Sequence, residues 1–217
     1  MKSLKTWNGF AICLLFVVVS SSSFGQMRSG KLGVGASGSL YLFVPNLSDG
    51  LMKGGGGASL SYSLMEHLGL RAMFGAGQLG WKDPSGLSNT TTMLSGNVYL
   101  SFDMIPHGTF NPYLFGGVGG IYFDPRSDQG TYLATNFSKI DINYLGGVGF
   151  DYFFSEFFSM TLSGEFALTN TDRLDMQRHL GTNDTYSRVN LEFRYYFFDQ
   201  DYVTKLIQAL QARYKGK

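Results

Sequence analysis

Residues 187–198, which read Ser-Arg-Val-Asn-Leu-Glu-Phe-Arg-Tyr-Tyr-Phe-Phe, decide the fold. Large apolar residues occupy every second position of this stretch: Val189, Leu191, Phe193, Tyr195 and Phe197. The positions between them include the charged residues Arg188, Glu192 and Arg194. Successive side chains of a strand point to opposite faces, so the stretch has one apolar face and one charged face. It predicts a β-strand whose two faces meet different surroundings.

The start of the chain has the layout of a secretory signal peptide. Lys2 and Lys5 give a positive start, residues 10–19 an apolar core, and Ser23-Phe24-Gly25 a small-x-small cleavage site. A spanning helix needs about 20 apolar residues, which is far more than this core supplies. We therefore expect residues 1–25 to be removed.

Cys13 is the only cysteine of the chain and lies inside that leader. It follows Ile12 and sits within the apolar core, so its position does not fit a lipoprotein attachment site. The mature chain is then expected to lack disulfides, thiolate metal sites and a cysteine nucleophile. Removing Lys2 and Lys5 from the 17 Lys and Arg residues leaves 15 against 16 Asp and Glu. This balance gives no basic patch for nucleic acid.

Alternation like that of residues 187–198 recurs along the chain. The eight segments are 32–44, 57–65, 68–79, 92–104, 112–123, 139–153, 158–170 and 187–198. The segment 112–123 carries bulk on both faces. No run after the leader is long and apolar enough for a helical span, so a membrane protein with this sequence must be a closed barrel.

The connections between these segments alternate in length. Long ones are expected at 45–56, 81–91, 124–138 and 171–186, and short ones at 66–67, 105–110 and 154–157. Outer-membrane barrels have short periplasmic turns and longer external loops. The pattern therefore predicts that the first strand starts on the periplasmic side.

Charged residues are confined to one face of the predicted strands. The eight inward candidates are Arg71, Asp103, Asp141, Asp151, Glu165, Arg188, Glu192 and Arg194. An eight-stranded barrel has a lumen just wide enough for side chains, and the bulky apolar set exceeds that space. Lys or Arg on a lipid face costs about 2–4 kcal/mol at the midplane. Both arguments predict that the apolar face meets lipid; a soluble lipocalin-like carrier would have the opposite arrangement.

Several aromatic residues gather near the predicted periplasmic ends of the strands. They are Phe102, Phe150, Tyr152, Phe158, Tyr195 and Phe197. Aromatic girdles mark the boundary between lipid and water in membrane barrels. This grouping predicts such a girdle.

Two glycine-rich segments and the aromatic last strand resemble a known family. Residues 110–120 read Phe-Asn-Pro-Tyr-Leu-Phe-Gly-Gly-Val-Gly-Gly, and residues 144–150 read Tyr-Leu-Gly-Gly-Val-Gly-Phe. With the eight-strand pattern, residues 30–198 look like the OmpA/OmpX-type outer-membrane β-barrel proteins, often labelled the porin family. The resemblance implies an all-β, eight-stranded antiparallel up-and-down transmembrane barrel in a Gram-negative envelope. It carries no catalytic residues with it.

Four inward charges form the candidate site, a polar network of the lumen: Arg71, Glu165, Glu192 and Arg194. Their charges sum to zero, as buried charges must be paired to be tolerated. Gly33 and Gly35 leave room beside the long side chains of the last strand once the barrel closes. We therefore favour a lumen plugged by polar side chains; the alternative is a narrow pore or gate for small solutes.

Histidines offer a weak case for catalysis. His67 and His107 fall in predicted periplasmic turns. His179 falls in the last external loop, with Asp172, Asp175 and Ser187 nearby in sequence. A lipid A-modifying enzyme would need a histidine triad at the outer rim, but no spacing ties these residues together. Fold analogy alone supports that alternative. We expect no enzyme activity.

Metal and cofactor sites are also not expected. Asp124, Asp128 and Gly130 lack the ligand spacing of a calcium loop. The glycine runs at 54–57 and 116–120 precede no helix that could hold a phosphate. Neither pattern indicates a cofactor.

Residues 199–217 depart from a plain barrel. Val203, Leu206, Ile207 and Leu210 recur at helical spacing, which predicts a short amphipathic helix. We expect it in the periplasm or along the inner-leaflet interface. A docking helix for a periplasmic partner is the alternative.

The sequence thus predicts a signal peptide (1–25), an outer-membrane barrel (26–198) and a periplasmic tail (199–217). We expect a monomer in contact with outer-membrane lipid or lipopolysaccharide, inserted by the barrel-assembly machinery. Its expected role is structural, adhesive or interactive, carried by the external loops.

Overall fold

The computed structural model describes residues 30–44, 49–82, 86–127, 138–171, 174 and 183–198. The expected signal peptide and the expected C-terminal helix both lie outside these residues. Among the described residues, no helix is long and apolar enough to cross a membrane. What the described chain forms is a single sheet of antiparallel strands.

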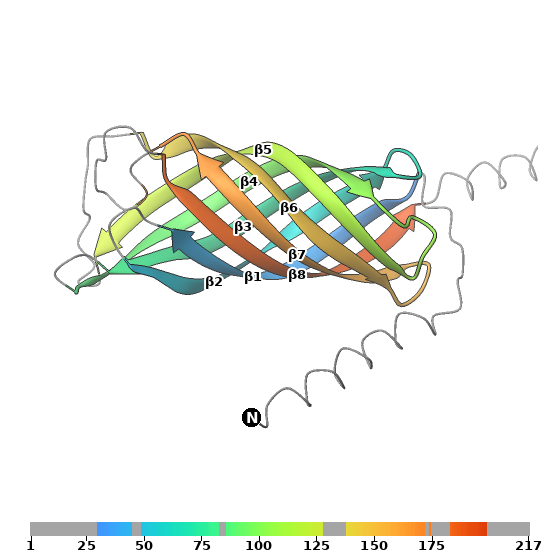
Figure 1. Ribbon diagram of the computed structural model, residues 1–217, viewed down its shortest axis with the longest axis horizontal. Helices are drawn as coiled ribbons and strands as arrows, with labels where there is room; N and C mark the ends of the chain where they lie inside the picture. Colours follow the sequence, from blue (N-terminus) through green and yellow to red (C-terminus); the bar gives the residue numbers. More distant parts are fainter. Residues whose placement is uncertain are drawn as a thin grey trace, which may run out of the picture.

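Eight strands follow one another around a closed barrel (Figure 1). They are β1 (Leu32–Val44), β2 (Asp49–Ser63), β3 (Leu68–Lys82), β4 (Ser88–Asp103), β5 (Phe110–Ser127), β6 (Ile140–Phe153), β7 (Phe158–Thr169) and β8 (Thr185–Phe198). Each strand pairs with its sequence neighbour, and β1 pairs with β8. Closure leaves no sheet edge along the wall, as a spanning sheet requires. The predicted architecture is confirmed.

The two ends of the barrel differ in their connections. The short-turn end carries residues 64–67, 104–109 and 154–157, together with the start of β1 and the end of β8. The opposite end, called here the long-loop end, carries the connections 128–139 and 170–184. These two names are kept below.

The strands at the long-loop end run farther than the sequence pattern indicates. β2 begins at Asp49 rather than at residue 57, and β3 and β4 are paired as far as Lys82 and Ser88. The expected loops 45–56 and 81–91 therefore shrink to 45–48 and 83–87. Residues 88–92 read Ser-Asn-Thr-Thr-Thr. Threonine is β-branched and has a high strand propensity, so this stretch can form a strand although it has no apolar face. Alternation of apolar residues could not reveal this polar part of the sheet.

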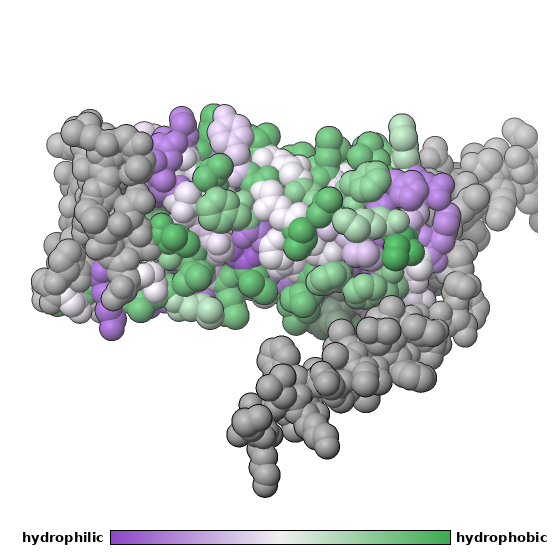
Figure 2. All heavy atoms as spheres, in the orientation of Figure 1, coloured by the Kyte–Doolittle hydropathy of each residue, from purple (hydrophilic) through white to green (hydrophobic). Residues whose placement is uncertain are grey.

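The apolar side chains cover the outside of the barrel. Four strands each provide an example on this face. Leu60 is 47% exposed, Val98 50%, Leu162 45% and Phe193 58%. By contrast, Glu165 and Arg194 are 8% and 1% exposed inside the barrel. Figure 2 shows mostly apolar side chains along the wall, with hydrophilic ones toward its ends. The predicted assignment of the two faces is confirmed.

Aromatic side chains line the outer surface near the short-turn end. Phe158 packs against Tyr195 with ring centroids 5.0 Å apart, and Tyr195 stacks on Phe197 at 6.5 Å. Farther around the barrel, Phe110 stacks on Phe150 at 5.3 Å. The arrangement fits the predicted girdle at a membrane boundary.

Large apolar side chains fill the lumen toward the long-loop end. They include Phe43, Leu79, Trp81, Met93, Ile121 and Phe123, each no more than 1% exposed. Phe43 and Trp81 pack edge to face, with ring centroids 5.9 Å apart. The plug of polar side chains expected from the sequence is therefore joined in this half by apolar side chains, which lie beside buried polar residues such as Asn89 and Thr91. Trp81 lies in a segment that the sequence pattern assigns to a loop, so the pattern does not place its side chain in the lumen.

An arginine in the middle of the lipid-facing wall should destabilise the barrel. Val98 lies midway along the outward residues of β4, so we expect Val98→Arg to lower the free energy of unfolding by about 2–4 kcal/mol. Urea titration in lipid vesicles, followed by heat-modifiable gel migration, measures this loss. The control is Leu87→Arg, because Leu87 is 57% exposed in the connection before β4. Equal losses in the two variants would contradict a lipid-facing wall.

Candidate functional site

Charged side chains converge inside the barrel toward the short-turn end. All four predicted network residues point into the lumen, where Arg71, Glu165, Glu192 and Arg194 are between 1% and 8% exposed, but Glu165 lies farther from the short-turn end than the other three. Strand alternation turns them inward, away from the apolar wall. Charges buried in this way need partners, so the pairing decides what the site can do.

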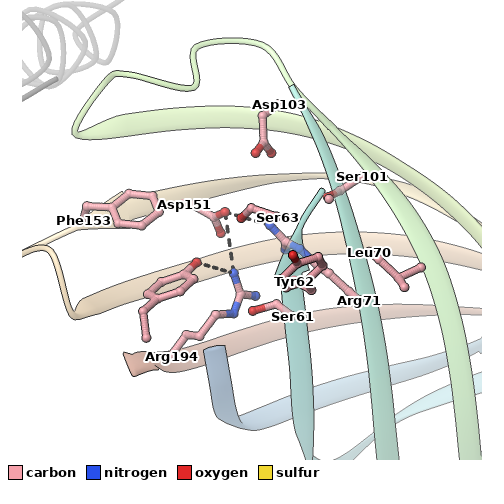
Figure 3. Close-up of a pocket in the computed structure, with 12 residues that line it drawn as sticks. Ser61, Tyr62, Ser63, Leu70, Arg71, Ser101, Asp103, Asp151, Phe153 and Arg194 are labelled. Carbon is pink, nitrogen blue, oxygen red and sulfur yellow. Dashed lines mark hydrogen bonds and ion pairs between the residues drawn. The ribbon is translucent and has the colours of Figure 1, made fainter. Parts of the chain in front are cut away.

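Asp151 of β6 is the centre of the network nearest the short-turn end. Its Oδ2 lies 2.8 Å from Arg71 Nη2 and 3.7 Å from Arg194 Nη1. Thr161 donates its hydroxyl to Asp151 Oδ1 at 2.5 Å. Figure 3 shows Asp151 joined in this way to arginines from two other strands. One carboxylate thus links β3, β6 and β8 across the lumen.

Glu192 and Arg194 of β8 form a second pair beside it. Arg194 donates from Nε to Glu192 Oε1 at 2.9 Å, and Ser59 donates to the same oxygen at 2.6 Å. Arg194 Nη1 also donates to the hydroxyl of Tyr196 at 3.1 Å. A Cβ at Gly35 of β1 would lie 2.3 Å from Glu192 Oε1, so a larger residue there would force the Glu192 carboxylate to shift. The space expected beside the last strand is present and is filled.

Glu165 lies apart from the other three predicted residues. Its partner is Arg188, whose Nη2 donates to Glu165 Oε2 at 2.7 Å. Arg188 also donates to the hydroxyl of Tyr41 at 3.4 Å. The predicted set therefore divides into two groups, in which Arg71, Arg188 and Arg194 contact Asp151, Glu165 and Glu192. Asp103, which is 8% exposed, lines the cavity beside Arg71 and Asp151.

Sequence reasoning placed Asp151 and Arg188 on the inward face but left them out of the site. Glu165 and Arg188 are direct partners in the ladder between β7 and β8. The register between β7 and β8 would have predicted this ion pair, because directly opposed residues on one face of a sheet interact. Asp151 and Arg71 lie on strands that do not pair. Only the closed lumen brings those two together.

The space left among these side chains is small. A cavity of about 20 Å³ is lined by Ser61, Ser101, Asp151 and Arg194, and one of about 10 Å³ lies beside Glu165 and Arg188. Within the described chain, the hydroxyls of Ser61 and Ser101 have no protein hydrogen-bond partner. Cavities of this size and polarity suit single ordered waters. They do not suit an organic solute.

Residues 11–197 match the family described as the outer membrane protein beta-barrel domain. The chain belongs to this family. Its place is accordingly the bacterial outer membrane, and the short-turn end faces the periplasm, as in other outer-membrane barrels. No curated protein matches the sequence.

Solved structures of three outer-membrane proteins are similar to this barrel. OprG from Pseudomonas aeruginosa has 16% identity and a TM-score of 0.53, with 81% of this chain and 99% of OprG covered. Neisserial surface protein A has 15% identity and a TM-score of 0.56, with 76% and 97% covered. Ail, the attachment invasion locus protein of Yersinia pestis, has 13% identity and a TM-score of 0.51, with 78% and 99% covered. At these identities the likeness concerns the fold alone.

The histidines of this family member do not form a catalytic group among the described residues. His67 and His107 lie in neighbouring short turns, where His107 Nε2 is 2.7 Å from the Glu66 carboxylate. All three of these side chains are about half exposed. His179, Asp172 and Asp175 lie outside the described residues, while Ser187 is half-buried on β8. In the described ranges, no group of three His, Cys, Asp or Glu residues could hold a metal ion.

Removing one partner of the Glu165–Arg188 pair should destabilise the barrel strongly. Arg188→Met leaves the Glu165 carboxylate buried without its guanidinium, which costs about 3–5 kcal/mol. We expect the double variant Glu165→Gln, Arg188→Met to recover much of that loss, since no buried charge remains. Unfolding free energies of both single variants and the double variant, measured in vesicles, give the coupling. Additive losses would show that the two side chains do not act as a pair.

Proposed function

We propose that this barrel keeps its lumen closed and acts through its external end, in a structural, adhesive or interaction role. The observation that carries the proposal is the filling of the lumen along its length. Large apolar side chains cluster toward the long-loop end, the contacts of Asp151 and Glu192 with arginines lie toward the short-turn end, and the Glu165–Arg188 pair lies between them beside Tyr41. A solute would have to displace both layers to pass.

The two layers oppose ion flow for different reasons. Around Phe43, Trp81 and Phe123 a permeating ion would lose its water without gaining polar partners, and such desolvation is costly. Around Asp151 and Glu192 each carboxylate is already held by a guanidinium and a hydroxyl. The two cavities beside these side chains, of about 20 and 10 Å³, suit single waters.

The external end supplies the features that an interaction role needs. Its connections 128–139 and 170–184 are the longest between strands. At the outer end of β5, the carboxylate of Asp124 contacts Arg126 and Lys139, whose side chains are 49% and 31% exposed. Loops on a rigid scaffold commonly carry binding. Outer-leaflet lipid and external molecules are the partners that this end would meet.

A narrow pore for small solutes is the competing function, and planar-bilayer recording separates the two. We expect the reconstituted protein to show no steady conductance, because the ion pairs and the apolar layer both block the lumen. Insertion is checked by heat-modifiable migration of protein recovered from the same vesicles. Stable channels on the nanosiemens scale from the folded protein would rule out the closed lumen.

A further inference from the structure

The outer wall carries a compact group of charges at the long-loop end of β5. Asp124 faces outward there, because Thr92, its directly opposed residue on β4, is exposed on the wall. Arg126 donates from Nε and Nη2 to Asp124 Oδ2 at 3.1 and 3.0 Å. Lys139, just before β6, contacts the other oxygen of the same carboxylate. These three residues, called here the Asp124 group, have a net charge of +1.

Asp124 fixes its two cations in place without covering them. The carboxylate is 11% exposed, whereas the side chains of Arg126 and Lys139 are 49% and 31% exposed. A guanidinium presents its donors in a planar fork that matches phosphate oxygens, and a lysine ammonium adds a point charge. A guanidinium and an ammonium held side by side at the surface therefore suit a phosphate.

Farther along the wall, the cover of apolar side chains has a gap. Gly96 of β4 and Gly120 of β5 are directly opposed on the outward face. A Cβ at Gly120 would meet no atom closer than 4.0 Å. Phe74 bounds the gap on one side, since its ring lies 3.6 Å from a Cβ built at Gly96, and Ile142, opposite Gly120 on β6, bounds it on the other. This glycine gap leaves room for an acyl chain against the wall.

The Asp124 group and the glycine gap lie in line along β5. Arg126 follows Gly120 by six residues, which is about 20 Å along a strand. Tyr122 and Ile140, a directly opposed and exposed pair, lie between them. A phosphate-bearing lipid has the same order of parts, with an anionic head followed by an acyl chain of comparable length.

The two ends of the described barrel differ in the exposed charges that they carry. Lys82 and Arg126 are exposed at the long-loop end, whereas Glu66 and Glu156 are exposed in the short turns. Cations near a membrane surface attract anionic headgroups. This difference favours an anionic lipid in the leaflet at the long-loop end, which is the outer leaflet.

We propose that the Asp124 group binds the phosphate of an outer-leaflet lipid, one acyl chain of which covers the glycine gap. This inference rests on the proposed role of the external end and names a lipid as its partner. The phosphate replaces water around Arg126 and Lys139, and the chain packs over Gly120 between Phe74 and Ile142. The site lies on the outside of the wall, so binding needs no change in the lumen.

Lipid binding to the protein extracted from the outer membrane in detergent tests the site. Native mass spectrometry measures the affinity for lipid A that carries its phosphates and for the same lipid without them. We expect the phosphate-free lipid to bind at least about tenfold more weakly. Inorganic phosphate should not compete, because it lacks the acyl chain that fills the glycine gap.

Substitutions of the two cations test the headgroup contact. Arg126→Gln and Lys139→Gln should each weaken binding of phosphorylated lipid A about fivefold, which is the usual contribution of one cation beside an anionic lipid. The matched control is Lys82→Gln, because Lys82 is exposed at the same end but lies on β3, outside the Asp124 group. It should leave the affinity within about twofold. Heat-modifiable migration shows that each variant is folded.

A leucine placed in the gap tests the acyl-chain contact separately. Gly120→Leu should weaken binding several-fold while the cations stay unchanged. Gly38→Leu is its control, since Gly38 faces outward on β1 and a Cβ there would also meet no atom within 4 Å. The two variants should differ although each adds the same side chain to the lipid-facing wall.

Three results would overturn the lipid site. They are equal affinity for the two forms of lipid A, equal losses in Arg126→Gln and Lys82→Gln, and full competition by inorganic phosphate. The first would leave no phosphate contact, the second would indicate a diffuse basic rim, and the third a site for the free ion. Steady conductance of the unaltered protein would instead contradict the closed lumen, so failure of the proposed function is told apart from failure of the lipid site.

Discussion

A strand that crosses lipid has no water to satisfy its backbone, so every N–H and C=O must find a partner inside the sheet. The pairing of β1 with β8 meets that requirement by closing the ring. Closure also determines the surroundings of each side chain, because every second residue of a strand is then enclosed in a narrow lumen. Apolar residues such as Val98 and Phe193 face out, and the charged residues must be satisfied by one another. The ion pairs of Asp151 and Glu165 are thus a direct result of the closed sheet.

The sequence predicted the fold well because its signal is local. Alternation within residues 187–198 is enough to turn Phe193 outward and Arg194 inward, and both side chains lie where this pattern places them. Pairing is less local. Which carboxylate meets Arg71 depends on how β3 and β6 face each other across the lumen, and alternation within either strand does not contain that distance. Residues 49–56 were missed for another reason, since this part of β2 is rich in glycine and has too few apolar residues to show alternation.

Fold and role separate clearly in this molecule. OprG and Ail share its architecture at 16% and 13% identity, so the barrel itself places few demands on individual residues. What distinguishes one such barrel from another must lie in the contents of the lumen and in the connections at its ends. Here the lumen is divided into an apolar external half and an ionic periplasmic half.

The position of Asp151 has a consequence for biogenesis. This carboxylate joins guanidiniums from β3 and β8, and β8 is the last strand to be synthesised. The contact of Asp151 with Arg194 cannot form until β8 takes its place beside β1 and β7. Closing the seam between the first and last strands and completing the partners of this carboxylate are therefore one step.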